Sequence, residues 1–212
     1  MASTAPRERR RVALREAILE AARGLLRSEG LRALTMRRIA EAVDYAPASL
    51  YSHFGSREAL LAELCRAGMA GLRAALERAV AGIDDPYARL AAAGRAYLQF
   101  ALDEPDVYRL MFMEDAAITK AVFEHVEWED GAAALAIVAA PFVQLRAAGA
   151  PLPADDPARL TDLFFAAVHG VASLRLACPS IPATDDAALI ATAVDAIAGR
   201  AVRASGRAAA SA

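Results

Sequence analysis

The stretch from Thr35 to Glu58, TMRRIAEAVDYAPASLYSHFGSRE, predicts two short helices joined by a tight turn. Its apolar residues recur three and four positions apart, which is the spacing along one face of an α-helix. They are Met36, Ile39, Ala40 and Val43 in the first helix, and Leu50 and Phe54 in the second. Asp44 and Tyr45 interrupt the pattern, and Pro47 then suits the first turn of a new helix, where no N–H is needed. The sequence therefore predicts a helix-turn-helix.

The face opposite these apolar residues carries side chains that can hold a nucleic-acid backbone. Phosphate oxygens accept hydrogen bonds from hydroxyl, imidazole and guanidinium groups, and such contacts position a protein on a duplex. The available donors are Arg37, Arg38, Ser49, Tyr51, Ser52, His53 and Arg57. This composition favours a partner over a merely structural helical hairpin.

The segment resembles the DNA-binding domain of TetR-type transcriptional regulators. Their usual pattern has a threonine, an Ile-Ala pair, a Leu-Tyr-x-His-Phe element and a Ser-Lys-Glu-x-Leu element. The matching residues are Thr35, Ile39, Ala40, Leu50, Tyr51, His53, Phe54, Ser56, Glu58 and Leu60. The resemblance implies a homodimer that binds a double-stranded DNA operator, most often as a repressor, and that responds to a small-molecule effector.

Three positions depart from the family pattern. Asp44 replaces the usual turn glycine, which is tolerable because aspartate enters the left-handed region more readily than most residues. Ala46 replaces a frequent serine cap, so one capping hydrogen bond of about 1 kcal/mol should be missing. Arg57 replaces lysine and presents its charge as a fork.

We expect DNA contacts from the motif and from a basic arm before it. Thr35, Tyr51, His53 and Arg57 would hold phosphates, as the resemblance implies, while Tyr45 and Ser49 would approach base edges. The arginines near the N-terminus could reach phosphates or the minor groove, or could form only a solvated helix end. The predicted DNA-binding residues are Arg10, Arg11, Thr35, Arg37, Tyr45, Pro47, Ala48, Ser49, Tyr51, His53 and Arg57.

The charge distribution agrees with this placement. Residues 1–60 hold 11 basic and 7 acidic side chains, whereas residues 61–212 hold 13 and 19. The basic end of the chain is therefore the end that should bind DNA.

The rest of the chain predicts more helices and no strands, so we expect an all-α protein of about nine helices. The expected helices, apart from the two of the motif, are Arg7–Glu29 with Gly30 as its stop, four that begin near Ser56, Asp85, Glu104 and Thr184, Trp128–Ala148, and Asp156 to about Cys178. Residues 1–6 are expected to be disordered. The predicted domains are a helix-turn-helix domain (1–60), an effector-binding and dimerisation domain (61–205) and a disordered tail (206–212).

Aromatic and methionine side chains concentrate in the C-terminal part. Most should be core, and a minority could line an effector cavity, because such surfaces adapt to varied apolar ligands. The candidates are Tyr97, Phe100, Tyr108, Met111, Phe112, Trp128, Phe142, Phe164 and His169.

The last two predicted helices are apolar on more than one face. One chain could bury both faces, but a two-fold four-helix bundle between two copies would also cover them and would suit paired half-sites on DNA. The predicted interface residues are Leu160, Leu163, Ala167, Val171, Leu174, Ile190, Val194 and Ile197. The segment FFAAVHGVASL resembles the His-Gly signature of the WHG type of TetR C-terminal domain.

We expect no catalytic residue, cofactor or metal. His169 is interpreted as a buried or interface histidine, on the ground that no Ser, Cys or carboxylate stands at helical spacing beside it to form a nucleophile and base pair. His125 with Glu124, Glu127 and Glu129 is interpreted as a solvated acidic face, because neighbouring helical positions point in different directions. A helical ligand-binding or catalytic protein that keeps the motif only as scaffold remains the alternative.

The chain has no features of an exported or membrane protein. Cys65 and Cys178 lie far apart without metal-ligand spacing, and no apolar run follows the N-terminal arginines. The longest apolar run, Ala132 to Val143, is shorter than the roughly 18 residues of a membrane span. We therefore expect a cytoplasmic protein without a membrane partner.

Overall fold

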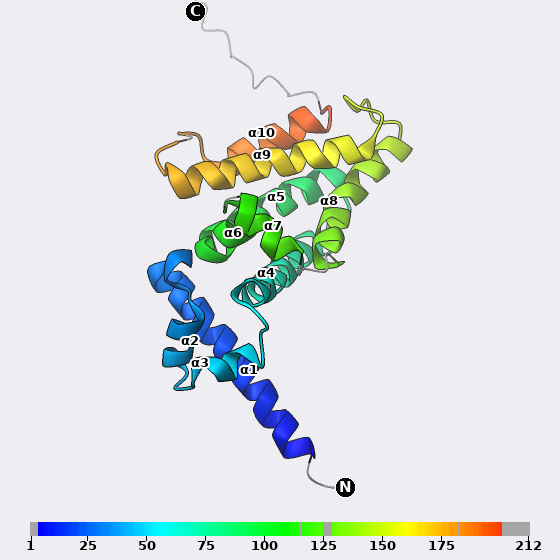
Figure 1. Cartoon of the computed structure of the whole chain (residues 1–212). Helices are drawn as coiled ribbons and strands as arrows, with labels where there is room; N and C mark the ends of the chain where they lie inside the picture. The colour runs from blue at the N-terminus through cyan, green and yellow to red at the C-terminus, as the bar shows by residue number, and fades with distance from the viewer. Residues whose placement is uncertain (1–3, 115, 125–128, 182, 201–212) are drawn as a thin grey trace, which may run out of the picture. The chain divides into compact units, whose positions relative to one another are not determined.

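The computed structural model describes residues 4–114, 116–124, 129–181 and 183–200. Within these ranges every regular element is helical, which confirms the all-α prediction (Figure 1). The α-helices are α1 (Thr4–Glu29), α2 (Met36–Ala42), α3 (Pro47–Tyr51), α4 (Arg57–Val80), α5 (Pro86–Asp103), α6 (Pro105–Phe112), α7 (Ala116–Phe123), α8 (Glu129–Ala147), α9 (Pro157–Ala177) and α10 (Asp186–Ile197). A short 3₁₀ helix, η1 (Leu31–Ala33), follows α1.

Most helices begin where local sequence signals place them. A side-chain oxygen before the helix accepts a hydrogen bond from a first-turn N–H, which satisfies a donor that has no partner within the helix. The capping pairs are Ser56 with Ala59 N–H (3.0 Å), Asp85 with Ala88 N–H (2.8 Å), Asp156 with Ala158 N–H (2.9 Å) and Asp185 with Ala188 N–H (3.0 Å). These contacts confirm the starts of α4, α5 and α9, and place that of α10 two residues after Thr184.

One predicted boundary differs from the structure, one helix was not predicted, and one predicted start lies outside the described residues. α1 begins at Thr4, so residues 4–6 are helical and the prediction that they are disordered was wrong. α7 was not predicted, although Asp115, a residue type that often caps helices, directly precedes its first residue in the sequence, and the described ranges contain ten α-helices. Trp128, the predicted first residue of α8, lies outside the described residues.

The chain forms two compact units, each made of two separate sequence segments. The first unit consists of Met1–Leu72 and Asp103–Gly131, and the second of Arg73–Leu102 and Ala132–Ala212. The first unit thus contains α1 to α3, the first part of α4, α6 and α7, while the second contains the rest of α4, nearly all of α5 and α8, and α9 and α10. This division differs from the predicted boundary at residue 60, and the predicted tail lies outside the described residues.

Close packing between α4 and α6 explains why α6 belongs to the first unit. The Cys65 thiol lies 3.9 Å from the carbonyl oxygen of Leu110. A Cβ atom placed on Gly68 would lie only 2.5 Å from Sδ of Met111 and 2.7 Å from Cγ1 of Val107, so the absent side chain permits the contact. Burial raises the pKa of Cys65 to about 12, so this thiol stays protonated at neutral pH.

The second unit has its own aromatic and aliphatic core. Phe142 of α8 is fully buried, and its ring centroid lies 6.4 Å from that of Phe164 of α9. A Cβ atom on Gly94 of α5 would lie 2.7 Å from Cγ2 of Ile190 and 3.4 Å from Cγ1 of Val168. Gly94 therefore lets α5 approach α9 and α10 closely.

α8 and α9 are both long and apolar. They contain 19 and 21 residues with mean hydropathy of 1.2 and 1.3, so length and composition alone would allow either to cross a membrane. Core helices of soluble proteins meet the same criteria. These values therefore do not identify a membrane protein.

Candidate nucleic-acid interface

The α2–turn–α3 segment has the geometry of a helix-turn-helix. Thr35 caps α2, because its Oγ1 accepts the Arg38 N–H at 3.3 Å. Asp44 has a φ of 57°, which confirms that it takes the left-handed conformation usual for glycine. The Tyr45 N–H then donates to the Ala40 carbonyl at 3.0 Å and closes the turn.

α3 is short, and its two faces are sharply different. Leu50 is fully buried, while Tyr51 is 53% exposed and Tyr45, before the helix, is 49% exposed. Pro47 and Ala48 are also exposed, and Ser49 is half-buried. The residues predicted to approach base edges therefore lie on or beside the outer face of α3, and Ala46 makes no side-chain cap, as expected.

One detail of the predicted second helix was wrong. α3 ends at Tyr51, so Phe54 is buried just beyond the helix instead of within it. Its N–H donates to the Leu50 carbonyl at 2.9 Å, and the guanidinium of Arg15 lies 4.5 Å from its ring centroid. Arg15 also pairs with Glu63 at 2.6 Å, so α1, the end of the motif and α4 are tied together.

His53 lies half-buried just after α3. Its Nδ1 atom is buried and has no hydrogen-bond partner. An unpaired acceptor costs less to bury than an unpaired N–H, so a ring proton fits this position better on Nε2 than on Nδ1. Nε2 is then the atom able to donate to a phosphate.

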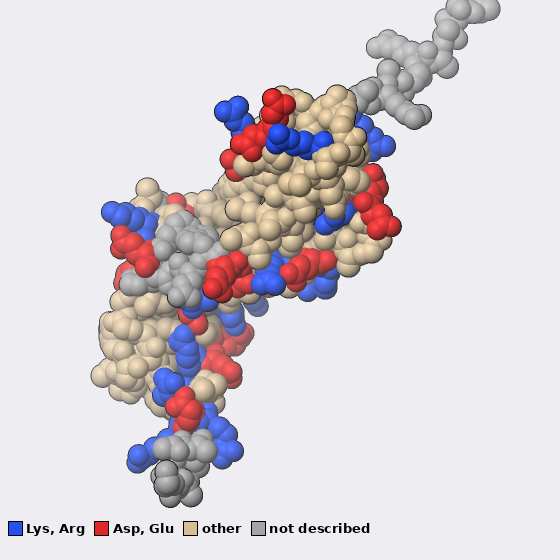
Figure 2. All heavy atoms as spheres, turned by 90° about the vertical axis from the view of Figure 1, so that its right-hand side faces the viewer, with Lys and Arg blue, Asp and Glu red and all other residues tan. Residues whose placement is uncertain are grey.

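Arg10, Arg11 and Arg37 are exposed, and Arg11 and Arg37 form surface ion pairs. Arg10 and Arg11 lie in the basic stretch of α1, where Figure 2 shows several basic side chains (blue) close together, all of them arginines in the sequence. Arg11 pairs with Glu8 at 2.7 Å, and Arg37 pairs with Glu41 at 2.9 Å. Exposed pairs of this kind contribute about 1 kcal/mol or less, so a phosphate can replace the carboxylate.

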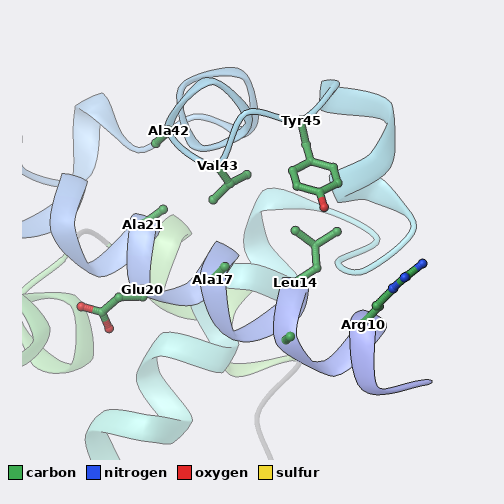
Figure 3. A pocket seen from close by; sticks show the side chains of 9 residues that line it. Arg10, Leu14, Ala17, Glu20, Ala21, Ala42, Val43 and Tyr45 are labelled. Carbon is green, nitrogen blue, oxygen red and sulfur yellow. The ribbon is translucent and has the colours of Figure 1, made fainter. Parts of the chain in front are cut away.

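A groove of about 650 Å³ lies between α1 and the end of α2 (Figure 3). Its floor is apolar, with alanines of both helices. Tyr45 and Arg10 stand at one end beside Leu14, and Glu20 lies toward the other. The sequence did not predict this groove, because it depends on how α1 packs against a turn more than twenty residues later in the chain.

Arg57 is placed differently from the other predicted contacts. It is half-buried, and its Nε donates to the Leu34 carbonyl at 2.7 Å while Nη2 donates to the Leu31 carbonyl at 3.0 Å. Two of its nitrogens are therefore engaged with the main chain around η1.

The predicted effector residues do not gather within one unit. Tyr108, Met111 and Phe112 belong to the first unit, and Trp128 lies outside the described residues. The remaining candidates are in the second unit and are Tyr97, Phe100, Phe142, Phe164 and His169. Tyr108, Met111, Phe142 and Phe164 are almost fully buried, which makes them core side chains in this structure.

A polar and aromatic cluster surrounds His169 in the second unit. The Tyr97 hydroxyl lies 3.3 Å from Nδ1, and the Ser173 hydroxyl lies 3.3 Å from Nε2. The Phe165 ring stacks on the imidazole at a centroid distance of 5.7 Å. The sequence interpretation overlooked Ser173, which stands one helical turn after His169. The group on the other ring nitrogen is the phenol of Tyr97, whereas a catalytic triad has a carboxylate there.

The His169 cluster should make stability depend on pH. Burial lowers the pKa of His169 below its ordinary value of 6.5, so the folded protein binds this proton less readily than the unfolded chain does. We expect the free energy of unfolding to fall as the pH drops below 6.5, measured by urea denaturation across a pH series. The variant His169→Gln should lack this part of the dependence, and identical profiles for both proteins would contradict the assignment.

The predicted dimer residues separate into two groups. Leu160, Ile190, Val194 and Ile197 are buried within their own unit, so placing them at an interface was wrong. Periodicity could not distinguish them, because α9 and α10 are apolar on several faces. The other four residues remain accessible: Leu163 and Leu174 are 51% and 43% exposed, and Ala167 and Val171 are half-buried.

Within the described ranges, no three His, Cys, Asp or Glu side chains come together in a way that could hold a metal ion. His125 and Glu127, from the predicted acidic face, lie outside those ranges. Cys65 is buried and Cys178 is exposed, and both are free thiols.

Both parts of the chain match known families. Residues 18–64 match the family described as bacterial regulatory proteins, tetR family, and residues 90–197 match the tetracyclin repressor-like C-terminal domain. A comparison with curated proteins gave no match. Neither description names the WHG type, so that detail stays a prediction.

Solved structures share the fold over nearly the whole chain. The chain is 30% identical to a protein of unknown function from a Rhodococcus species, with a TM-score of 0.71 over 87% of this chain and 93% of that one. PfmR, a TetR family transcriptional regulator from Thermus thermophilus, is 21% identical, with a TM-score of 0.61 over 88% and 99%. The transcriptional regulator FadR from Bacillus subtilis, solved with stearoyl-CoA, is 13% identical, with a TM-score of 0.67 over 86% and 97%.

Proposed function

The chain belongs to the TetR family of bacterial regulatory proteins and is a DNA-binding transcriptional regulator, and we propose that it acts as a cytoplasmic, homodimeric repressor released by a small molecule. The observation that carries the DNA-binding part is the two-sided motif, with Leu50 buried and Tyr45 and Tyr51 exposed. The proposal includes no catalytic step and no cofactor.

We assign the contacts by side-chain chemistry. Thr35, Tyr51 and His53 donate to phosphates, because a hydroxyl or an imidazole N–H can each supply one hydrogen bond to a phosphate oxygen. Arg10, Arg11 and Arg37 add positive charge that attracts the phosphates of the DNA backbone. Tyr45 and Ser49 approach base edges, and Pro47 and Ala48 offer only apolar contact, for example with a thymine methyl group.

The Tyr51 hydroxyl provides the direct test. Tyr51→Phe removes one donor from an exposed position, so we expect roughly tenfold weaker binding to a duplex that the wild-type protein selects from a random-sequence library. Fluorescence anisotropy measures this affinity. The control is Tyr87→Phe in the second unit, where the half-buried ring lies under Arg200, and it should bind as the wild type does.

Two results would count against these assignments. Equal affinity for Tyr51→Phe and wild type would remove Tyr51 from the interface. If the wild-type protein enriched no sequence from the library, the regulator function itself would be contradicted and the scaffold alternative favoured.

Dimerisation is supported by the apolar side chains that remain exposed on α9. Leu163, Ala167, Val171 and Leu174 recur at spacings of three and four residues, so they share one helical face. Water-exposed leucines at 51% and 43% on one helix are most readily explained by a second copy that covers them. Sedimentation of a single-chain mass at micromolar concentration would contradict the dimer.

Effector control is supported by the family and by the cluster in the second unit. FadR was solved with stearoyl-CoA, and for the present chain we propose only a small-molecule effector. Tyr97, Phe165, His169 and Ser173 combine aromatic surface with hydroxyl and imidazole groups, which is the mixture that ligand sites use. Ligand and operator should then be coupled by about 1 to 3 kcal/mol. A ligand that binds, seen through Trp128 fluorescence, without altering operator affinity would refute the coupling.

A further inference from the structure

We propose that Arg57 serves operator binding as a positioning residue, which fixes the start of α2, and that it makes no phosphate contact. This inference rests on the proposed DNA-binding function. It concerns a residue that the sequence assigned to phosphate binding by resemblance, and it gives that residue a different physical role.

The hydrogen bonds of Arg57 carry the argument. It is the first residue of α4, and it donates to the carbonyls of Leu34 and Leu31 at 2.7 and 3.0 Å. Leu34 directly precedes Thr35, the cap of α2. The guanidinium therefore links the first turn of α4 to the chain segment that sets the position of the first motif helix.

An ion pair holds α2 from another side. Both terminal nitrogens of Arg38 donate to the carboxylate of Glu29 at the end of α1, one of them at 2.6 Å. The start of α2 is therefore fastened to α1 through Arg38 and to α4 through Arg57. A forked guanidinium can reach two carbonyls at once, whereas the single ammonium of lysine cannot reproduce both angles.

The surroundings of Arg57 also argue against a phosphate there. Arg57 lines a hollow of about 410 Å³ together with Glu29, Arg32 and Glu114. Glu29 is already paired with Arg38, and Glu114 also lines the hollow, so an incoming phosphate would meet two carboxylates beside Arg57. The exposed Arg37, by contrast, has 82% of its side chain accessible.

Two substitutions separate a positioning role from a phosphate contact. Arg57→Lys keeps the charge but loses the fork, and Arg57→Met keeps most of the stem but loses charge and donors. Each is measured on the duplex selected by the wild type, for affinity and for the slope of log affinity against log salt concentration. Arg37→Met is the control, because loss of a phosphate contact should reduce the magnitude of that slope by about 0.9 for each helix-turn-helix of the dimer.

We expect both Arg57 variants to bind about tenfold more weakly with an unchanged salt slope. We also expect faster amide hydrogen exchange within residues 31–42, because α2 loses its link to α4. A purely electrostatic role would leave that exchange unaffected.

Other outcomes overturn the inference. If Arg57→Lys binds as the wild type does, or if Arg57→Met reduces the salt slope as a lost phosphate contact would, Arg57 touches DNA and the positioning role is wrong. Either result leaves the DNA-binding function intact. Should Arg57→Met fail to fold, the affinity and exchange of Arg57→Lys still decide. Only a wild-type protein that selects no duplex contradicts the function itself.

Discussion

Operator binding should weaken about a thousandfold when the monovalent salt concentration rises from about 50 to about 200 mM. The reason is counterion release: each phosphate neutralised by the protein contributes about −0.9 to the slope of log affinity against log salt. Arg10, Arg11 and Arg37 in each of the two copies of the dimer would neutralise roughly six phosphates. Anisotropy titrations of the selected duplex at a series of salt concentrations measure the slope.

A matched comparison uses an arginine of the second unit. Arg159 is exposed on α9, away from the helix-turn-helix in sequence, and Arg159→Met should leave the slope unchanged. An affinity that stays constant over the whole salt range would contradict the arginine assignments, because no specific duplex contact made by these side chains can escape the salt dependence.

The variant Phe142→Ala should lose about 3 to 5 kcal/mol of unfolding free energy. Phe142 has no exposed surface and packs against Phe164, so its truncation leaves a cavity that a helical core can only partly close. Urea denaturation monitored by circular dichroism provides the measurement.

The neighbouring residue provides the control for Phe142. Val143 is 54% exposed on the same helix, so Val143→Ala should change stability by no more than about 0.5 kcal/mol. A loss below about 1 kcal/mol for Phe142→Ala would mean that the region is loosely packed. That outcome would favour the sequence-based assignment of Phe142 to an effector cavity.

The parts of this structure that were predicted from sequence are those set by local chemistry. Asp85, Asp156 and Pro157 mark helix starts because capping and the missing proline N–H act within one turn. Asp44 was expected in the left-handed region for a similarly local reason. The outer and inner faces of the helix-turn-helix followed from the spacing of its apolar residues.

What was missed depends on contacts between distant segments. Arg57 reaches carbonyls 23 and 26 residues earlier, and nothing in its own neighbourhood indicates that. The burial of Leu160 and Ile190 depends on which face of α9 and α10 turns inward, and helices that are apolar all round give no periodic signal. Ser173 is different, since its spacing from His169 was visible in the sequence and could have been noticed.

The discontinuity of the first unit has a practical consequence for protein dissection. Truncation after residue 60 would remove α6 from the first unit, and with it the buried residues Leu61, Leu64 and Cys65 of α4. Fusing residues 1–60 to another regulator at a single junction would break the same packing. A functional chimaera must instead exchange two separate stretches of polypeptide at once.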